Sequence, residues 1–206
     1  MKETEIVIID DSFEIEDPLV VELGIKFPDA NITVKNNPDD GLKYILANLS
    51  KKIVVLLDYN FNTGQPKGHD ILLRIRNHTS LVYVIIMTAK QFTTIPNNEL
   101  VDFVNNNALA IVQNTSDTKE IVSIVDKAIQ QLSVRVDCAL EQWISKHSED
   151  DQKKPYLLTS DGRELTLRDI LKEIRTETSL GQKLERNIIM LAIDLLTRDK
   201  KQLGND

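Results

Sequence analysis

Cysteine is nearly absent from this sequence, since Cys138 is the only one among 206 residues. No disulfide can form within the chain, and this usage is typical of a reducing cytoplasm. The chain also lacks an apolar run of membrane-spanning length, and its first residues do not resemble a signal peptide. We therefore expect a cytoplasmic protein that has no contact with a membrane.

A large excess of basic over acidic residues is also absent from both parts of the chain. Residues 1–152 carry 14 Lys and Arg against 23 Asp and Glu, a net charge of −9. Residues 153–206 carry 11 against 9, a net charge of +2. Neither part is basic enough to indicate nucleic-acid binding on electrostatic grounds. The three histidines are scattered along the chain and form no metal-ligand set with Cys138.

The acidic residues, in contrast, follow a clear pattern. The apolar run Ile53–Leu57 ends at Asp58, and the apolar run Ile6–Ile9 ends at Asp10-Asp11. Runs without alternation are typical of parallel strands that are buried on both faces, and ligands bind outside the carboxyl ends of such strands. Three carboxylates at one edge raise one another's pKa values unless a cation compensates them. Oxygen ligands of this kind favour Mg²⁺.

Two further strands complete this pattern. Leu81–Met87 is followed by Thr88-Ala89, and Leu109–Val112 is followed by Gln113-Asn114. With these motifs in this order, residues 4–131 resemble the receiver domain of two-component response regulators. The run that begins at Gly68 also fits the start of that family's third helix.

The resemblance implies a phosphorylation-controlled signalling protein rather than an independent enzyme. Asp58 would accept a phosphoryl group from a histidine kinase or phosphotransfer protein, with at most slow autodephosphorylation. Asp11, Asp58 and the backbone carbonyl of Asn60 would hold Mg²⁺ directly, and Asp10 would act through water. Thr88 would form a hydrogen bond to the phosphoryl group.

The sequence departs from the family at the end of the fifth strand. Gln113 stands where the family has a lysine that pairs with the phosphoryl oxygens, and Ala110 stands where an aromatic switch residue is expected. A glutamine can donate only a neutral hydrogen bond, which is about half as strong as a charge-assisted one. The long loop Tyr59–Lys67 offers Lys67 as a source of the missing charge, but a solvated loop lysine is the favoured interpretation.

Strands and helices alternate through the first 131 residues, which predicts an α/β fold with a doubly wound parallel sheet. The resemblance implies five strands in a flavodoxin-like order, 2-1-3-4-5. Residues 116–147 then contain neither Gly nor Pro and predict one extended last helix. Its apolar stripe from Leu132 to Trp143 extends past a receiver core and requires a partner. A helix broken near Ser133 is the alternative.

The remaining residues predict a small α+β segment. Residues 148–155 are a charged linker, and residues 156–206 contain a hairpin with an Asp161-Gly162 turn and two helices. The last helix is apolar on every side at Ile188–Ile193, which is typical of a buried helix. Because about 50 residues form only a small core, we expect a homodimer through residues 132–147 and 180–198.

Four other functions remain open at this stage. A pseudo-receiver that binds a partner without phosphorylation is favoured by Gln113. A DNA-binding transcription regulator is disfavoured by the +2 charge and the apolar last helix. A phosphatase of the haloacid dehalogenase type needs an acid where Asn60 lies, and a flavin-binding protein needs a phosphate-cradling loop where Asp10-Asp11 would repel a phosphate.

Overall fold

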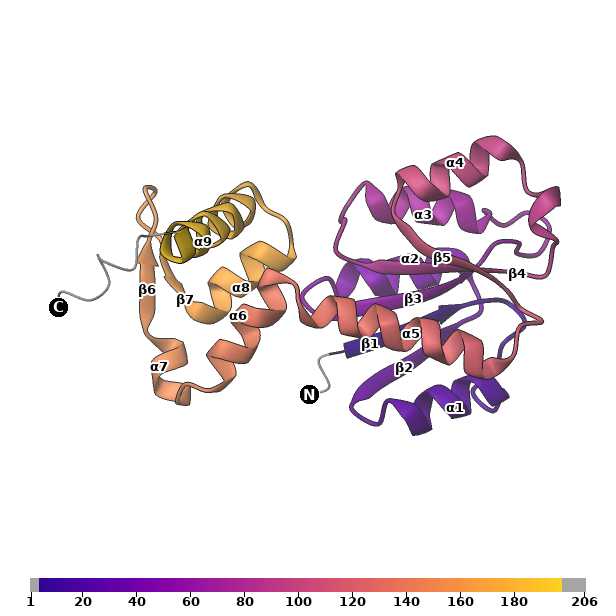
Figure 1. The fold of residues 1–206 in the computed structure, drawn as a ribbon, viewed down its shortest axis with the longest axis horizontal. Coiled ribbons are helices and arrows are strands. Elements are labelled where there is room, and N and C mark those ends of the chain that lie inside the picture. Colours follow the sequence, from indigo (N-terminus) through magenta and orange to yellow (C-terminus); the bar gives the residue numbers. More distant parts are fainter. Residues whose placement is uncertain (1–3, 198–206) are drawn as a thin grey trace. The chain divides into compact units, whose positions relative to one another are not determined.

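The computed structural model describes residues 4–197, and the chain divides into two compact units after Leu132. Each unit has its own secondary structure, and we describe them separately (Figure 1). The helices within residues 4–197 are each too short or too polar to span a bilayer.

The N-terminal unit contains a five-stranded parallel sheet in the order β2-β1-β3-β4-β5, which confirms the predicted fold class. Each strand pairs in parallel with its neighbours, so all carboxyl ends lie at the same edge. The strands are β1 (Thr4–Ile9), β2 (Ala30–Lys35), β3 (Lys52–Asp58), β4 (Tyr83–Thr88) and β5 (Ala108–Gln113).

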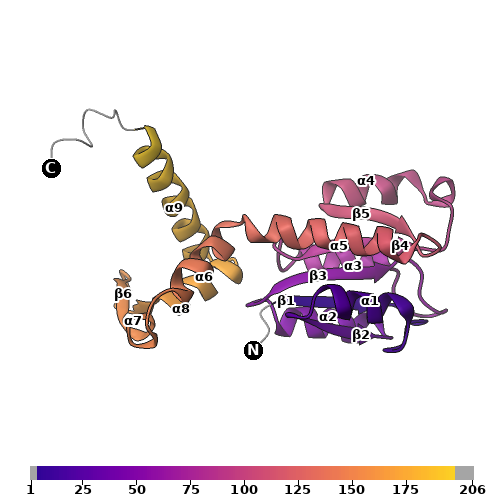
Figure 2. The same cartoon turned by 60° about the horizontal axis from the view of Figure 1, so that its bottom comes forward.

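Helices cover both faces of this sheet (Figures 1 and 2). One face packs against α1 (Pro18–Lys26) and α5 (Thr118–Ser133). The other packs against α2 (Pro38–Ala47), α3 (Gly68–Arg76) and α4 (Asn97–Asn105), and a short 3₁₀ turn, η1 (Phe92–Thr94), precedes α4. The double cover explains why the strands are apolar without alternation, because neither face of the sheet meets water.

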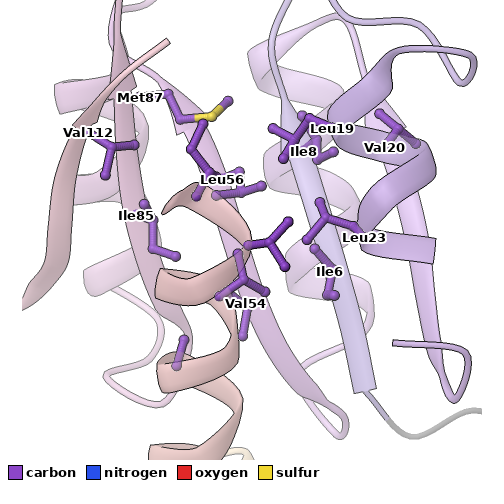
Figure 3. Close-up of a cluster of buried hydrophobic side chains, with 14 of the residues drawn as sticks. Ile6, Ile8, Leu19, Val20, Leu23, Val54, Leu56, Ile85, Met87 and Val112 are labelled. Atoms are coloured by element: carbon purple, nitrogen blue, oxygen red, sulfur yellow. The ribbon is translucent and has the colours of Figure 1, made fainter. Parts of the chain in front are cut away.

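The core on the α1 and α5 face is formed by alternate residues of the central strands (Figure 3). Successive side chains of a strand point to opposite faces, so Val54 and Leu56 face α1 and α5 whereas Val55 and Leu57 face α2 and α3. All four are fully buried. This packing fixes the direction of β3 and therefore the position of Asp58 at its end.

The C-terminal unit is a small α+β structure. A two-stranded antiparallel hairpin turns through Gly162, which has a positive φ of 84°. Thr166 and Asp169 form a capping box at the start of α8. Its elements are α6 (Val136–Ser145), α7 (Glu149–Lys153), β6 (Pro155–Leu158), β7 (Glu164–Thr166), α8 (Leu167–Arg175) and α9 (Ser179–Thr197).

The prediction of one helix over residues 116–147 is wrong, and the alternative with a break near Ser133 is correct. α5 ends at Ser133 and α6 begins at Val136, with Arg135 in an extended conformation between them. Val134 and Val136 are β-branched and weaken helix propensity at this point. Asp137, in the first turn of α6, forms a buried ion pair with Arg175 at 3.0 Å, which anchors the start of the new helix.

The break also changes which side of α6 is buried. Leu132 belongs to the core of the N-terminal unit, whereas Trp143 is 45% exposed. The buried face of α6 consists instead of Asp137, Cys138, Glu141 and Ile144. Periodicity failed here because a buried arginine replaces an apolar partner: Arg175 pairs with Glu141 at 2.8 Å as well as with Asp137.

The charged segment 148–155 is not a free linker. It forms α7, whose N-cap Ser148 accepts a hydrogen bond from the backbone of Asp151. Gln152 is buried and donates to the carbonyl oxygens of Ile144 and His147. A cap and a buried amide therefore hold a segment whose composition alone indicated a linker.

Within a single chain, the last helix is not buried as its composition predicted. α9 packs closely on α8 only at its start, where a Cβ on Gly181 would lie 1.9 Å from the Glu173 carbonyl oxygen. From Ile188 to Thr197 every residue is exposed, and Figure 2 shows this end of α9 extending away from α6 and α8. Arg198, the last residue of the expected contact range, lies outside the described residues.

Candidate functional site

The carboxyl ends of β1 and β3 place three acids together. Ile9 pairs with Leu57 across the two strands, so Asp10-Asp11 and Asp58 follow at neighbouring positions of one edge. One carboxylate oxygen from each residue lies within 4.8 Å of the others. Asp10 is 1% exposed and Asp58 is 6% exposed, while Asp11 is half-buried. The sequence-based expectation of a shared acidic pocket thus corresponds to an actual cluster.

Asp10 is held by a turn and has one oxygen to spare. Its Oδ1 accepts hydrogen bonds from the backbone N–H of Ser12 at 2.9 Å and from the Ser12 hydroxyl at 2.6 Å. Its Oδ2 is buried without a partner. Burial raises the pKa of Asp10, and the hydrogen bonds from Ser12 lower it by less. The charges of Asp11 and Asp17 add a smaller increase. A buried acceptor without a donor is costly unless a ligand occupies the site.

Asp11 connects the acid cluster to the long loop after β3. Its Oδ2 accepts a hydrogen bond from the backbone N–H of Asn62 at 2.9 Å. Asn60, which lies between Asp58 and Asn62 in the sequence, is half-buried. The hydrogen bond from Asn62 therefore holds the start of this loop beside the cluster at Asp11.

Asp58 is the most perturbed acid of the cluster. Burial first, and then the nearby charge of Asp10, raise the pKa of Asp58 to about 7, against smaller opposing hydrogen bonds from the backbone of Asn60 and Tyr59. The start of α3 packs closely against the backbone of Asp58, since a Cβ on Gly68 would lie 2.1 Å from the Asp58 carbonyl oxygen. Strand and helix together fix where this carboxylate lies.

Thr88 and Gln113 lie side by side at the ends of β4 and β5. Thr88 is fully buried, and its Oγ1 accepts a hydrogen bond from the backbone N–H of Lys90 at 3.0 Å. The register pairs Thr88 with Gln113, which is half-buried. Gln113 therefore occupies the strand-end position next to the hydroxyl, and Ala110 lies three residues earlier beside Ile85.

Lys67, considered as a source of the missing charge, is paired elsewhere. Its ammonium lies 3.3 Å from Glu99 of α4, and more than half of its side chain is exposed. Glu99 also accepts a hydrogen bond from the Tyr59 hydroxyl. The structure thus connects Lys67 to α4 rather than to the acid cluster.

The residues present fit a divalent metal of the Mg²⁺ type. The cluster offers only oxygen ligands, which hard cations prefer, and Asp10 Oδ2 is a buried oxygen that lacks a donor. Bound cations are often the largest charge in such a site, and they reverse the pKa increase that neighbouring carboxylates cause.

Sequence reasoning missed three contributors to this site. Ser12 was visible in principle, because an Asp commonly accepts a hydrogen bond from the backbone two residues later. The contacts of Asn62 and Lys90 depend on how two loops fold back on the sheet. For Lys90 the only available signal was its position two residues after a strand-end threonine.

Comparison with solved structures shows that the N-terminal unit has the fold of response regulator receiver domains. A response regulator receiver domain protein from Clostridium thermocellum is 20% identical, with a TM-score of 0.50, and the match covers 62% of this chain and 95% of that one. The response regulatory domain of protein mrkE from Klebsiella pneumoniae is 17% identical, with a TM-score of 0.50 and coverages of 63% and 98%.

The N-terminal domain of a response regulator/sensory box/GGDEF three-domain protein from Carboxydothermus hydrogenoformans is similar at 15% identity and a TM-score of 0.50. At these identities the likeness establishes the receiver fold. No family model matches the sequence, and no curated protein matches it.

Proposed function

We propose that this protein is a response regulator in which Asp58 accepts a phosphoryl group from the phosphohistidine of a histidine kinase or phosphotransfer protein. The observation that carries the proposal is the cluster of Asp10, Asp11 and Asp58, in which a buried oxygen of Asp10 has no donor. The cluster lies at the carboxyl edge of a sheet with the receiver fold, next to the buried hydroxyl of Thr88.

In the proposed reaction, a carboxylate oxygen of Asp58 attacks phosphorus. An O–P bond forms, the P–N bond to the donor imidazole breaks, and the imidazole nitrogen leaves with the electron pair and takes up a proton from solvent. A bound Mg²⁺ would neutralise charge on the phosphoryl oxygens. Asp11, Asp58 and the carbonyl of Asn60 would hold it directly, and Asp10 through water.

Thr88 is suited to donate a hydrogen bond to the phosphoryl group on Asp58. Its oxygen already accepts a hydrogen bond from the backbone of Lys90, so its own proton can be donated elsewhere. Among residues 4–197 no acceptor is bonded to that proton. Gln113, beside Thr88, would donate from its amide. The chain then acts as a phosphoryl acceptor and not as an independent phosphatase, because Asn60 cannot serve as an acid.

Intact-mass spectrometry with acetyl phosphate and Mg²⁺ tests this proposal. We expect one phosphoryl adduct on the full chain, which disappears in Asp58→Asn and on chelation of the metal. Asp29 is an exposed acid directly before the start of β2, at the edge of the sheet opposite the cluster. Asp29→Asn therefore serves as the matched control and should retain the adduct. If neither this donor nor any histidine kinase produces an adduct, the pseudo-receiver becomes the better description. An adduct that persists in Asp58→Asn would contradict the assignment of the acceptor.

We further propose that output passes through a homodimer built on α9. Leu184, Ile188, Leu191 and Leu195 recur at steps of four, three and four, which places them on one helical stripe. The exposed apolar side chains of this helix are Ile188 (37%), Ile189 (42%), Met190 (58%), Leu191 (57%), Ile193 (49%), Leu195 (46%) and Leu196 (85%).

A second copy of the chain is the partner that these side chains fit best. Three of them, Ile188, Leu191 and Leu195, lie on the stripe. Covering the exposed half of each contributes roughly 1 kcal/mol, so the stripes of two copies together contribute on the order of 6 kcal/mol, within the range of the cost of association. Symmetric pairing buries the same stripe on both copies. The exposed end of α9 is apolar rather than basic, which favours a protein partner over DNA.

The structure also changes the expected interface. Leu132 is buried in the N-terminal core and cannot contribute to it. The contribution expected from residues 132–147 is therefore reduced to exposed side chains of the C-terminal unit such as Trp143.

A further inference from the structure

The proposed site is short of positive charge. Asp10, Asp11 and a phosphorylated Asp58 together carry about four negative charges, and one divalent cation supplies two. The strand-end positions next to them are Thr88 and Gln113, and neither side chain carries a charge. A cation from elsewhere in the chain would therefore stabilise the phosphorylated state selectively, because the excess negative charge is greatest there.

Two lysines, Lys67 and Lys90, lie on the loops that follow β3 and β4. The ammonium of Lys67 is paired with Glu99 at 3.3 Å. The ammonium of Lys90 lies 5.4 Å from the ring centroid of Tyr59, and Tyr59 directly follows Asp58. No carboxylate within residues 4–197 forms an ion pair with Lys90, whose side chain is exposed. Of the two, Lys90 is the cation that can move without breaking an ion pair.

The backbone of Lys90 is anchored to the site itself. Its N–H donates to Thr88 Oγ1 at 3.0 Å, so the side chain starts next to the hydroxyl that would face the phosphoryl group. A lysine side chain is a flexible four-carbon stem with a compact point charge, well suited to phosphate. The Tyr59 ring is buried, whereas the Lys90 side chain over it is exposed. An exposed cation gains less from the face of a ring than from a charge-assisted hydrogen bond to a phosphoryl oxygen, so a phosphoryl group would displace the ring as its partner.

We propose that Lys90 is the cation that binds the phosphoryl group on Asp58, in the role for which Gln113 lacks a charge. This inference rests on the proposed function and names the residue that supplies the missing positive charge. In the unphosphorylated protein the same ammonium lies over the Tyr59 ring.

Beryllofluoride, a phosphoryl mimic that needs no donor reaction, tests the proposal through binding alone. We expect Lys90→Gln to weaken beryllofluoride binding at saturating Mg²⁺ by about tenfold or more, equivalent to about 1.4 kcal/mol. Isothermal titration calorimetry on the full chain measures this. Binding of Mg²⁺ without the mimic should be unchanged or tighter in the same variant, because a positive charge has been removed near a cation site.

Weaker binding of the mimic without weaker binding of Mg²⁺ separates a phosphate contact from damage to the fold, which would weaken the binding of both. Lys67→Gln is the matched control and should bind beryllofluoride as the wild type does. Lys90→Arg should retain most of the affinity, and Gln113→Lys added to Lys90→Gln should restore it from the neighbouring strand.

Several results would overturn the inference. Equal beryllofluoride affinity in Lys90→Gln and wild type would exclude the contact, and so would an equal loss in Lys67→Gln. A parallel loss of Mg²⁺ binding would show that Lys90 supports the fold instead. If the wild type binds no beryllofluoride and is not phosphorylated, the proposed function fails together with this inference. If the wild type binds beryllofluoride and Lys90→Gln binds it with the same affinity, only the inference about Lys90 is overturned.

Discussion

Two buried carboxylates, one near the start of β1 and one directly after its end, have opposite surroundings. Glu5 is 1% exposed and accepts hydrogen bonds from Lys51 at 2.6 Å, and from Asn31 and Tyr44 at 2.8 Å each. Burial raises the pKa of Glu5, but these partners outweigh burial and leave the pKa below its usual value. Asp10, at the other end of the strand, has no basic partner, and its pKa is raised. One end of the strand therefore stabilises the ionised acid, and the other destabilises it.

Asp58→Asn should stabilise the metal-free protein at neutral pH. Because the pKa of Asp58 is raised to about 7 in the folded state, the folded protein binds more protons than the unfolded chain between about pH 4 and pH 7. Its free energy of unfolding therefore falls as pH rises through this range. The variant avoids this loss, and we expect a gain of roughly 2–4 kcal/mol at pH 8 that disappears below about pH 4.

Urea unfolding at several pH values with a chelator present measures this difference. Asp29→Asn, an exposed acid, should leave the pH dependence unchanged. Added Mg²⁺ should stabilise the wild type more than Asp58→Asn. If the free energies of unfolding of variant and wild type differed by a constant amount from pH 4 to pH 8, ionisation of Asp58 would not be the cause of the loss of stability.

The acids of the site could be predicted from the sequence, but their partners could not. Asp10, Asp11 and Asp58 follow apolar runs, and a parallel sheet brings strand ends together regardless of sequence detail. Lys67 and Lys90 carry long flexible side chains on loops, so their contacts depend on tertiary packing that no local pattern encodes. The same periodicity that located the strands gave no indication that Lys67 pairs with Glu99.

At the scale of elements, the start of α3 is fitted tightly against the end of β3. Gly68 donates its N–H to the Tyr59 carbonyl at 3.0 Å, and a Cβ there would meet the Asp58 carbonyl oxygen at 2.1 Å. Helix and strand can approach this closely only because Gly68 has no side chain. The position of Asp58 therefore depends on a residue that contributes no chemistry of its own.

Gly68→Ala should accordingly destabilise the protein and reduce phosphorylation of Asp58. We expect a loss of roughly 1–3 kcal/mol, as for other overpacked sites. Gly24→Ala in α1 is the matched control, since its Cβ would meet only Ile32 at an ordinary 3.8 Å, and alanine favours helix by up to about 1 kcal/mol. Thermal unfolding and intact-mass phosphorylation assays compare the two. Equal behaviour of both variants would show that the contact at Gly68 relaxes freely.

The helices of the C-terminal unit show where element prediction fails. Most of residues 116–147 are helical, but the spacing of their apolar residues could not reveal the break at Val134 and Arg135. The buried face of α6 contains Asp137 and Glu141, which composition assigns to the surface. Their partner Arg175 lies far along the chain, and a long-range ion pair leaves no periodic signal.

At the scale of the whole molecule, self-association through α9 should depend on the apolar stripe. Leu191→Glu places a charge at a side chain that is 57% exposed and outside the core, so it should abolish the dimer without unfolding the chain. Ile25→Glu, at a 76% exposed position of α1, is the matched control and should remain dimeric. Sedimentation equilibrium at micromolar concentrations measures both.

The same dimer should make helix content depend on concentration. The end of α9 has few tertiary contacts, and an isolated helix of this length is only marginally stable in water. Circular dichroism should therefore lose helical signal on dilution of the wild type, whereas Leu191→Glu should show the low value at every concentration. A wild type that stays monomeric at tens of micromolar, with or without phosphorylation, would exclude the dimer.

The unpaired acids of the receiver edge also bias how such a chain changes over generations. Because burial and repulsion raise the pKa values of Asp10 and Asp58, we expect neutral replacements at these positions to make the metal-free fold more stable. Under the proposed function, substitutions that remove the acceptor or a metal ligand would therefore carry no cost in stability. Phosphorylation would be easy to lose over generations, and its return would require a lineage to accept a weaker fold first.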